Sequence, residues 1–342
     1  MPTHEHRDRV LSDPVVPIRP SEHPGADALL RAYSQISFQG RTLGQAADLL
    51  TRMAEDRGLF KVLTLAGALV PGGMSMVIRE MIEYGFVDAI VSTGANMSHD
   101  LVEGFGHRHY RSCDLADDVE LREAYVNRIY DTFLAEEAFA ETEEHLLALL
   151  GNYDGVTSAD LTRYLGTVVD GPCILRTAAQ HGVPIFIPAL NDSELGIAIN
   201  RFNHVHAGAR KRAGARKVVW DGLADNEAFA EIIKGREDHG VVICGGGVPR
   251  NWAQQVTPLL EYLDVAPDQE LARTLPGYKY GLHITTDTPV FGGMSGCTFS
   301  ESISWGKYDV HARFVRVACD VTIALPLIVA AAIARVNASR RA

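Results

Sequence analysis

The stretch Phe60-Lys61-Val62-Leu63-Thr64-Leu65-Ala66, followed by Gly67-Ala68-Leu69-Val70-Pro71-Gly72-Gly73, decides the fold. Its first half is an apolar run of strand length, and its second half is a glycine-rich turn. A segment with helical periodicity then continues through Tyr84. A buried strand, a turn and a helix in this order make the unit from which parallel sheets are built.

The same unit recurs along the chain. The strand predicted at Phe86–Ser92 leads into the turn Thr93-Gly94-Ala95-Asn96 and a helical segment at 100–105. Further short strands are predicted at Val183–Ile187 and Val241–Cys244. The alternation predicts an α/β fold in which a mostly parallel, Rossmann-like sheet carries helices on both faces.

The remaining segments have their own patterns. Residues 1–40 are rich in proline, histidine and charge and are expected to form an N-terminal arm with a short helix near Gly25–Tyr33. Residues 41–342 are expected to form a single catalytic domain, with a helix at Leu43–Arg57. Residues 114–145 are acidic and are expected to be helical. The apolar segment 321–336 is short for a membrane span and favours a buried helix.

The overall composition excludes some classes of protein. The 342 residues carry a formal net charge of −11 and no basic run, which argues against a nucleic-acid binder. The five cysteines are widely spaced and never form CxxC, which indicates reduced thiols. The N-terminus is charged and lacks the apolar core of a signal peptide, so a cytoplasmic location is expected.

Turns at the carboxyl ends of the predicted strands indicate where a ligand binds. Ligands of open parallel sheets bind at that edge, and small residues let a phosphate approach the backbone amides. These turns favour a dinucleotide, although the GxGxxG fingerprint is absent. Asp192 and Asp320 would either bind ribose hydroxyls or cap helices. The turns are Gly67–Gly73, Thr93–Asn96, Asn191–Gly196, Gly245–Gly247 and Thr285–Thr286.

Lys307 ends the segment Ser300-Glu301-Ser302-Ile303-Ser304-Trp305-Gly306-Lys307, just before a run predicted to be a buried strand. Burial lowers the pKa of a lysine, and a neutral amine can form an imine. Glu301 and Trp305 offer an anion and an aromatic face, which together hold organic cations. The alternative is a surface turn with a solvated lysine.

Two other groups of residues favour structural roles. His99-Asp100 and His107-Arg108-His109 contain metal-ligand types, but no cysteine or carboxylate lies at zinc-like spacing, so no metal is predicted. Cys297 follows Gly296 and could be a nucleophile, but a small apolar filler is favoured.

Several ordered motifs resemble those of the deoxyhypusine synthase family. The resemblance extends in order from about residue 40 to about residue 335, and its departures resemble a bacterial, homospermidine-synthase-like branch. The motifs are Val87-Asp88-Ala89-Ile90-Val91-Ser92-Thr93-Gly94-Ala95, Ile185-Phe186-Ile187-Pro188-Ala189-Leu190-Asn191-Asp192-Ser193-Glu194-Leu195-Gly196, Ile243-Cys244-Gly245-Gly246-Gly247-Val248, Glu301-Ser302-Ile303-Ser304-Trp305-Gly306-Lys307, Ala318-Cys319-Asp320 and Pro326-Leu327.

The resemblance implies a mechanism and an assembly. Lys307 would carry a four-carbon amine as an imine, NAD would take hydride from spermidine and return it to the product, and a homotetramer would have active sites at a dimer interface. Amine contacts fall on Glu301 and Trp305. The implied NAD contacts are Gly67, Ala68, Thr93, Gly94, Ala95, Asp192, Gly246, Thr286, Asp320 and Val321.

The chain departs from the family pattern around the substrate. Adjacent glutamates of the family are replaced by Ser98 and His99, two aspartates by Ile197 and Met294, and a histidine by Asn251. Holding a long polyamine requires anions at both ends, so a shorter or less charged amine is expected.

The sequence therefore predicts an NAD-dependent aminobutyl transferase that acts on small polyamines through an imine on Lys307, with homospermidine as a candidate product. One alternative is a true deoxyhypusine synthase that modifies a translation-factor lysine. Others are an NAD-binding protein without transferase activity and a sirtuin-like, NAD-consuming deacylase.

Overall fold

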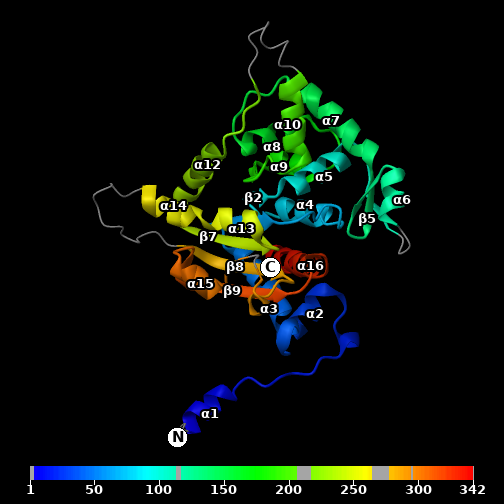
Figure 1. The fold of residues 1–342 in the computed structure, drawn as a ribbon. Helices are drawn as coiled ribbons and strands as arrows, with labels where there is room; N and C mark the ends of the chain where they lie inside the picture. The colour runs from blue at the N-terminus through cyan, green and yellow to red at the C-terminus, as the bar shows by residue number, and fades with distance from the viewer. Residues whose placement is uncertain (1–3, 113–116, 206–216, 264–276, 294–295, 342) are drawn as a thin grey trace.

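A six-stranded sheet forms the centre of the molecule, with the strand order β6-β2-β1-β7-β8-β9 (Figure 1). Every neighbouring pair in it is parallel, which confirms the predicted fold class. The computed structural model describes residues 4–112, 117–205, 217–263, 277–293 and 296–341. The strands are β1 (Leu59–Leu65), β2 (Ala89–Ser92), β6 (Ile185–Phe186), β7 (Asp238–Cys244), β8 (Tyr278–Thr285) and β9 (Tyr308–Ala318).

Helices pack on both faces of this sheet. The sheet helices are α2 (Gly25–Tyr33), α3 (Phe38–Glu55), α4 (Ser75–Glu83), α5 (Gly94–Gly104), α8 (Ser158–Val168), α9 (Ile174–His181), α10 (Glu194–Val205), α12 (Gly222–Lys234), α13 (Gly247–Gln254), α14 (Val256–Leu263), α15 (Phe299–Ser304) and α16 (Val321–Arg341). The predicted helix at 25–33 is confirmed, and α5 begins earlier than predicted because Thr93 caps it.

Alternate side chains of the central strands enter two separate cores. Leu63 and Leu65 of β1 belong to the larger core, which α2, α3, α4, α9 and α16 cover. Phe60 and Val62 belong to the smaller core, which α12, α13, α14 and α15 cover. Successive side chains of a strand point to opposite faces of the sheet. The nearly continuous apolar run at 59–65 therefore places apolar side chains on both faces, and both have to be covered.

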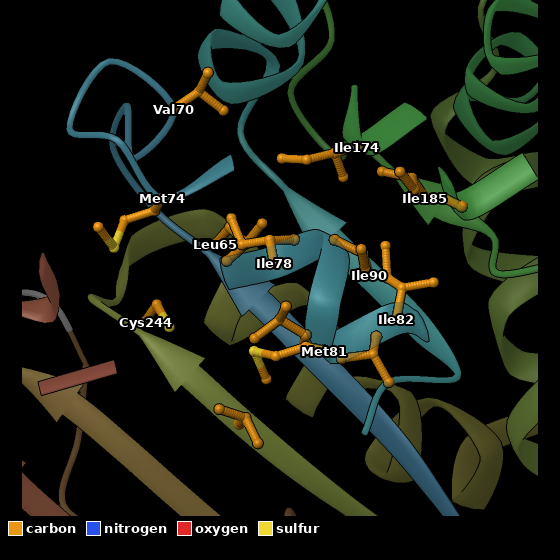
Figure 2. Packing of buried hydrophobic residues seen from close by; sticks show 14 of the residues in the cluster. Leu65, Val70, Met74, Ile78, Met81, Ile82, Ile90, Ile174, Ile185 and Cys244 are labelled. Carbon is orange, nitrogen blue, oxygen red and sulfur yellow. The ribbon is translucent and has the colours of Figure 1, made fainter. Parts of the chain in front are cut away.

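Helix α4 shows how the larger core is packed. Ile78, Met81 and Ile82 of α4 lie against Leu65 and Ile90 of strands β1 and β2 (Figure 2). These side chains are at most 2% exposed. Full burial of one such side chain contributes about 1.5–3 kcal/mol relative to exposure.

The acidic region after α5 differs from the prediction. Residues 114–116 lie outside the described residues, and the rest contains a hairpin between α6 (Asp118–Glu123) and α7 (Glu136–Leu150). Strand β5 (Thr132–Ala135) pairs antiparallel with β4 (Val126–Ile129) and with β3 (Tyr110–Arg111). The expectation of a continuous helix was wrong because the β-branched and aromatic residues of the hairpin favour strands, which average acidity conceals.

Strand β9 also differs from the prediction of a buried strand. It lies at one edge of the sheet, and most of its side chains are exposed or half-buried. An edge strand has only one neighbour, so an apolar run there does not imply full burial.

The apolar C-terminal segment is a core helix, as predicted. Among the described residues, α16 is the one helix long and apolar enough to cross a membrane. It packs against α2, α3 and β8, and residues such as Ala324, Leu325 and Ile328 are fully buried. Its composition is therefore explained by packing against the sheet.

The N-terminal region has two parts. Helix α1 (His4–Val10) lies at the end of an extended segment, and a short 3₁₀ turn at Pro20–Glu22 precedes α2 (Figure 1). Helix α2 packs against α3 and α16 and places the fully buried Leu30 in the core. The division at residue 40 stays a prediction.

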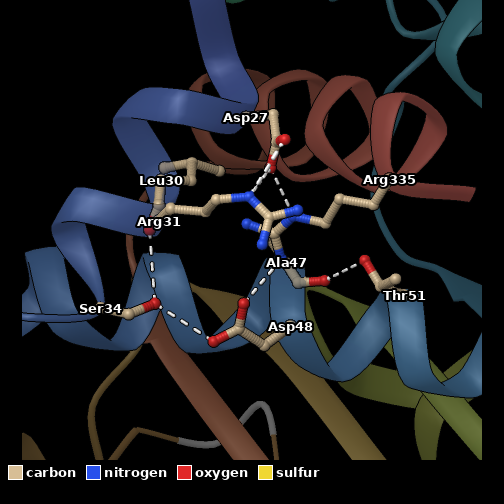
Figure 3. Close-up of polar contacts among 8 residues, drawn as sticks. All are labelled: Asp27, Leu30, Arg31, Ser34, Ala47, Asp48, Thr51 and Arg335. Atoms are coloured by element: carbon tan, nitrogen blue, oxygen red, sulfur yellow. Dashed lines mark hydrogen bonds and ion pairs between the residues drawn. The ribbon is translucent and has the colours of Figure 1, made fainter. Parts of the chain in front are cut away.

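Arg335 joins three helices through two ion pairs (Figure 3). Its Nε lies 2.5 Å from Asp27 of α2, and its Nη1 lies 2.6 Å from Asp48 of α3. The Arg335 side chain is only 5% exposed, whereas both aspartates reach solvent. Burial raises the pKa of Asp27, but hydrogen bonds from Arg335 and Arg31 outweigh it and hold the pKa below its usual value.

His239 is a buried histidine in β7 that packs edge-on against Tyr278, with ring centroids 4.8 Å apart. Neither ring nitrogen has a hydrogen-bond partner among the described residues. Burial lowers its pKa to about 4 from the ordinary 6.5, against a smaller opposing effect of Asp238.

Arg335→Ala is expected to lower the free energy of unfolding by about 2–4 kcal/mol, because it leaves two aspartates without their shared cation. Urea denaturation measures the change. The matched variant Arg340→Ala, an exposed position on the same helix, should change it by less than about 0.5 kcal/mol. Equal effects of the two variants would contradict the role given to Arg335.

Acid is expected to destabilise the fold through His239. Above pH 6.5 the histidine is neutral in both states, and between pH 6.5 and about 4 only the unfolded chain binds the proton. The free energy of unfolding should therefore fall as the pH falls through this range. His239→Leu should reduce the loss at pH 5 by about 1–2 kcal/mol. Parallel pH profiles of wild type and variant would rule out this contribution.

Candidate functional site

A crevice of about 200 Å³ lies at the carboxyl edge of the sheet. Four strand ends supply its walls: the turns after β1, β2, β6 and β7. Strand order reverses between β1 and β7, which is where open α/β sheets bind ligands. Five of the predicted cofactor residues line the crevice, namely Gly67, Thr93, Gly94, Asp192 and Gly246.

Side chains from neighbouring strands hold the turns of this crevice in place. Thr93 donates from Oγ1 to the Gly67 carbonyl at 2.7 Å, and the Leu69 amide donates to Asn96 Oδ1 at 2.6 Å. His283 Nε2 lies 2.6 Å from the Gly245 carbonyl. Burial lowers the pKa of His283 to about 4, so it is neutral at pH 7 and its Nε2 donates. Sequence reasoning missed Asn96 and His283 because their partners come from distant segments.

A close approach explains the glycine at position 94. A Cβ there would lie 2.4 Å from the Cβ and Oγ of Ser193. Ser193 accepts from the Gly196 amide at 3.2 Å, so the helix cap next to Asp192 is Ser193. Asp192 itself is exposed at the crevice and is not the cap.

The other five predicted cofactor residues are not among those that line the crevice. Asp320 accepts from the Thr322 amide at 2.7 Å and so caps α16, and its contact with NAD stays a prediction. Val321 begins α16, and Thr286 is exposed after β8. Ala68 follows Gly67 in its turn, and Ala95 lies in the first turn of α5.

Lys307 is buried, with 6% of its surface exposed. Its Nζ donates to Asn251 Oδ1 at 2.8 Å, and no carboxylate of the described residues lies within ion-pair distance. Burial lowers the pKa of Lys307. The surface-turn alternative is therefore wrong for this lysine.

The backbone before Lys307 fixes where that side chain starts. Helix α15 ends with the Gly306 amide bonded to the Ile303 carbonyl and the Lys307 amide bonded to the Ser302 carbonyl, at 3.0 and 3.1 Å. This is a Schellman motif, whose penultimate position needs a left-handed residue. Gly306 has φ +70°, which an L side chain rarely adopts.

Arg250 is a buried cation beside this turn that the sequence analysis did not single out. It is 3% exposed and donates from Nη2 to the Cys297 carbonyl at 2.6 Å. Its charge is a further influence that lowers the pKa of Lys307, after burial. The Cys297 thiol lies 3.0 Å from Ser302 Oγ, which supports a packing role for Cys297.

A larger cleft of about 800 Å³ adjoins the crevice. Asn251, Trp252 and Gly296 are among its lining residues. Gly247 and Val248 line both the cleft and the crevice. The hydrogen-bond partner of Lys307 thus lines a cleft that shares two residues of its wall with the crevice.

Glu301 lies on α15 and Trp305 is the C-cap of that helix, six and two residues before Lys307. Both are exposed, Trp305 by 63%. The charge of Glu301 weakly favours the protonated form of Lys307. An anion and an aromatic ring are therefore present at the surface near the buried amine.

Ser98 and His99 are not brought to Lys307 by any described contact. Ser98 Oγ accepts from the Leu195 amide at 3.2 Å. His99 Nδ1 lies 2.9 Å from His109 Nε2, and His109 Nδ1 lies 3.0 Å from Glu103. Burial lowers the pKa of His99 to about 4, so it is uncharged at pH 7.

The two positions at which the family has aspartates supply no negative charge either. Ile197 is 60% exposed on α10, and Met294 lies outside the described residues. Among the described residues, no group of three histidine, cysteine or acidic side chains could hold a metal ion.

The deoxyhypusine synthase family model matches residues 28–332. The chain belongs to the deoxyhypusine synthase family. This family is a class of transferases, so the chain is a deoxyhypusine synthase family enzyme.

Curated relatives match this family member over most of their length. "Probable deoxyhypusine synthase 2" of Archaeoglobus fulgidus is 38% identical over 301 residues, which cover 86% of this chain and 94% of that protein. "Probable deoxyhypusine synthase 1" of Methanosarcina mazei is 36% identical, with 96% of each covered. A "Deoxyhypusine synthase-like protein" of Chlorobaculum parvum is 31% identical, covering 93% and 89%.

Solved structures share the fold of this family member. A "putative deoxyhypusine synthase" of Entamoeba histolytica has a TM-score of 0.61 and 16% identity, and covers 94% of this chain and 97% of its own. The complex of AgrE with ornithine and NAD+ has a TM-score of 0.52 and 11% identity, covering 89% of this chain and 35% of AgrE.

Proposed function

We propose that this family member is an NAD-dependent aminoalkyl transferase that carries its aminobutyl group as an imine on Lys307. The observation that carries the proposal is the environment of Lys307 Nζ, which is buried and hydrogen-bonded to a neutral amide oxygen. A carboxylate in that place would stabilise the ammonium form, whereas an amide accepts a hydrogen bond without adding charge. The neutral amine is the nucleophilic form.

The lysine would act by exchange of amines. Its Nζ attacks the imine carbon of the donor, forms a C–N bond and displaces the donor's other amine, which leaves with the proton that Lys307 gives up. The acceptor amine then displaces Lys307 in the same way. Arg250, held by the Cys297 carbonyl, disfavours protonation of Lys307 during this cycle.

The crevice fits NAD by the chemistry of its walls. Enzymes of this family use NAD, and AgrE, which shares the fold, was crystallised with it. Gly67, Gly94 and Gly246 leave the backbone open to a phosphate, and Asp192 offers a carboxylate for ribose hydroxyls. When bound, NAD would supply the acceptor of hydride from the donor amine and the hydride that reduces the product.

The substrate is proposed to be a small polyamine that is shorter, or less charged at one end, than spermidine. Glu301 and Trp305 would hold one ammonium. Ser98, the neutral His99 and the exposed Ile197 supply no counter-charge for a second. Putrescine is then a suitable acceptor and homospermidine a suitable product, as in the proposed homospermidine-synthase-like branch.

Deoxyhypusine synthesis on a translation-factor lysine is the second candidate. It is favoured by the archaeal relatives named for that activity, which are 36–38% identical to this chain. NAD binding without transfer, and sirtuin-like deacylation, have less support because neither requires a buried nucleophilic lysine.

The assembly is proposed to be a cytoplasmic homotetramer in which a dimer interface completes the site, with residues 41–342 as one catalytic unit. Exposed apolar side chains near the cleft support an interface there. Val248 lines both spaces and is 53% exposed, and Trp305 is 63% exposed. Burial of such residues favours association.

Lys307→Arg should abolish transfer and leave NAD binding intact, because the charge remains and the nucleophile is lost. The protein is incubated with NAD and a panel of amines, and borohydride is then added. Mass spectrometry should find an aminoalkyl adduct on the Lys307 peptide, and its mass identifies the group transferred. Lys279→Arg, at a surface lysine paired with Asp238, is the control and should still be labelled. An adduct that persists in Lys307→Arg would refute the assignment.

Asn251→Asp tests whether the uncharged hydrogen-bond partner of Lys307 matters for its reactivity, because the variant keeps an oxygen in place and adds a negative charge. The added carboxylate should raise the pKa of Lys307 and move the onset of labelling to higher pH, with NAD affinity unchanged. Labelling of wild type should start at a lower pH than labelling of surface lysines. Identical pH profiles for the variant and wild type would remove Asn251 from the mechanism.

Asp192→Ala should weaken NAD binding about 5- to 100-fold, equivalent to about 1–3 kcal/mol for a lost hydrogen bond to ribose. Titration calorimetry measures the affinity. Glu194→Ala, an exposed carboxylate two residues away that does not line the crevice, is the matched control. Stoichiometric release of nicotinamide during turnover would instead favour the deacylase alternative.

A further inference from the structure

A second cleft, of about 700 Å³, lies at the amino ends of β1, β2 and β6, at the edge of the sheet opposite the crevice. Its walls include Phe60 and Lys61 near the start of β1, Asp88 just before β2, and Pro184 just before β6. These are the amino ends of the strands whose carboxyl ends form the crevice. No residue lines both this cleft and either the crevice or the 800 Å³ cleft that adjoins it.

The floor of this amino-edge cleft is apolar. Phe60 and Phe186 are 7% and 1% exposed, and Ala178 is 2% exposed. Ile232 of α12 adds a half-buried aliphatic wall. A volume of this size matches the sites that hold small organic molecules.

The rim of the cleft is cationic in a chain whose net charge is −11. Two of its basic residues are paired, Lys61 with Asp88 and Arg163 with Asp160, each at 2.8 Å. The remaining basic residues, Arg57, His181 and Arg236, have no carboxylate within ion-pair distance among the described residues. Both acidic lining residues, Asp88 and Asp160, are therefore already paired with a basic residue.

One of the two unpaired arginines, Arg236, is held in position. The guanidinium carbon of Arg236 lies 5.1 Å from the centre of the Phe60 ring. A cation over an aromatic face keeps its edge donors available for an anion. Arg57, just before β1, lines the same rim.

We propose that the amino-edge cleft is a binding site for a small organic anion, with its apolar body on Phe186 and Ile232 and its phosphate or carboxylate on Arg57 and Arg236. Guanidinium groups bind such oxyanions in a bidentate manner, and the apolar floor selects against inorganic ions. The site is separate from the crevice, so both can be occupied at once.

Titration calorimetry on the full chain, saturated with NAD, tests the proposal. The probes are naphthyl phosphate, naphthoate, inorganic phosphate and uncharged naphthol. Naphthyl phosphate or naphthoate should bind at least tenfold more tightly than inorganic phosphate and than naphthol, and the affinity should fall as salt is raised. Absence of binding at millimolar concentration, or equal affinity for naphthol, would overturn the proposal.

The double variant Arg57→Ala/Arg236→Ala should weaken binding of the charged probe at least tenfold. The matched double variant Arg122→Ala/Arg340→Ala removes two exposed arginines outside the cleft and should bind like wild type. Arg57→Lys/Arg236→Lys keeps the charge and should retain part of the affinity. Unchanged affinity in the alanine variant, or dissociation of an oligomer by it, would overturn the proposal, the latter by showing an interface between copies.

Discussion

The parallel pairing of β1 with β2 on one side and β7 on the other is the constraint on which the molecule depends. It aligns Leu65 with Ser92 and with Cys244, so three turns begin at the same edge. Parallel strands need long crossovers, and those crossovers supply the helices that cover both faces. The crevice is the gap that remains where the crossovers leave in opposite directions.

The two edges of this sheet have different chemistry for a physical reason. The carboxyl edge is formed by turns whose small residues expose backbone amides, and side chains such as Thr93, Asn96 and His283 hold those turns. The amino edge carries longer side chains, and its basic residues outnumber its acidic ones. The two edges of the same strands therefore suit the two ligands proposed above, a nucleotide at the carboxyl edge and a small organic anion at the amino edge.

The environment of Lys307 depends on burial without a counter-charge. Removing an ammonium from water costs free energy. A carboxylate partner would offset that cost, but it would do so by stabilising the charged form of the lysine. Burial, and after it the charge of the nearby Arg250, lowers the pKa of Lys307, and its hydrogen-bond partner Asn251 adds no negative charge. The Schellman turn at Gly306 keeps the lysine backbone in place, so the lowered pKa of Lys307 and its position have separate structural origins.

The sequence by itself determined the parallel α/β class and the strand-end turns, because apolar periodicity and glycine-rich turns are local signals. Its motifs also singled out Lys307 as a candidate buried lysine. It could not show the hairpin at 126–135 or the exposure of β9, since pairing and edge position are decided by distant segments. Only the tertiary structure placed Asn251 on Lys307 and assigned Asp320 to a helix cap. It also showed that Ser98 and His99 are occupied by other partners, because hydrogen bonds between remote residues leave no trace in local sequence.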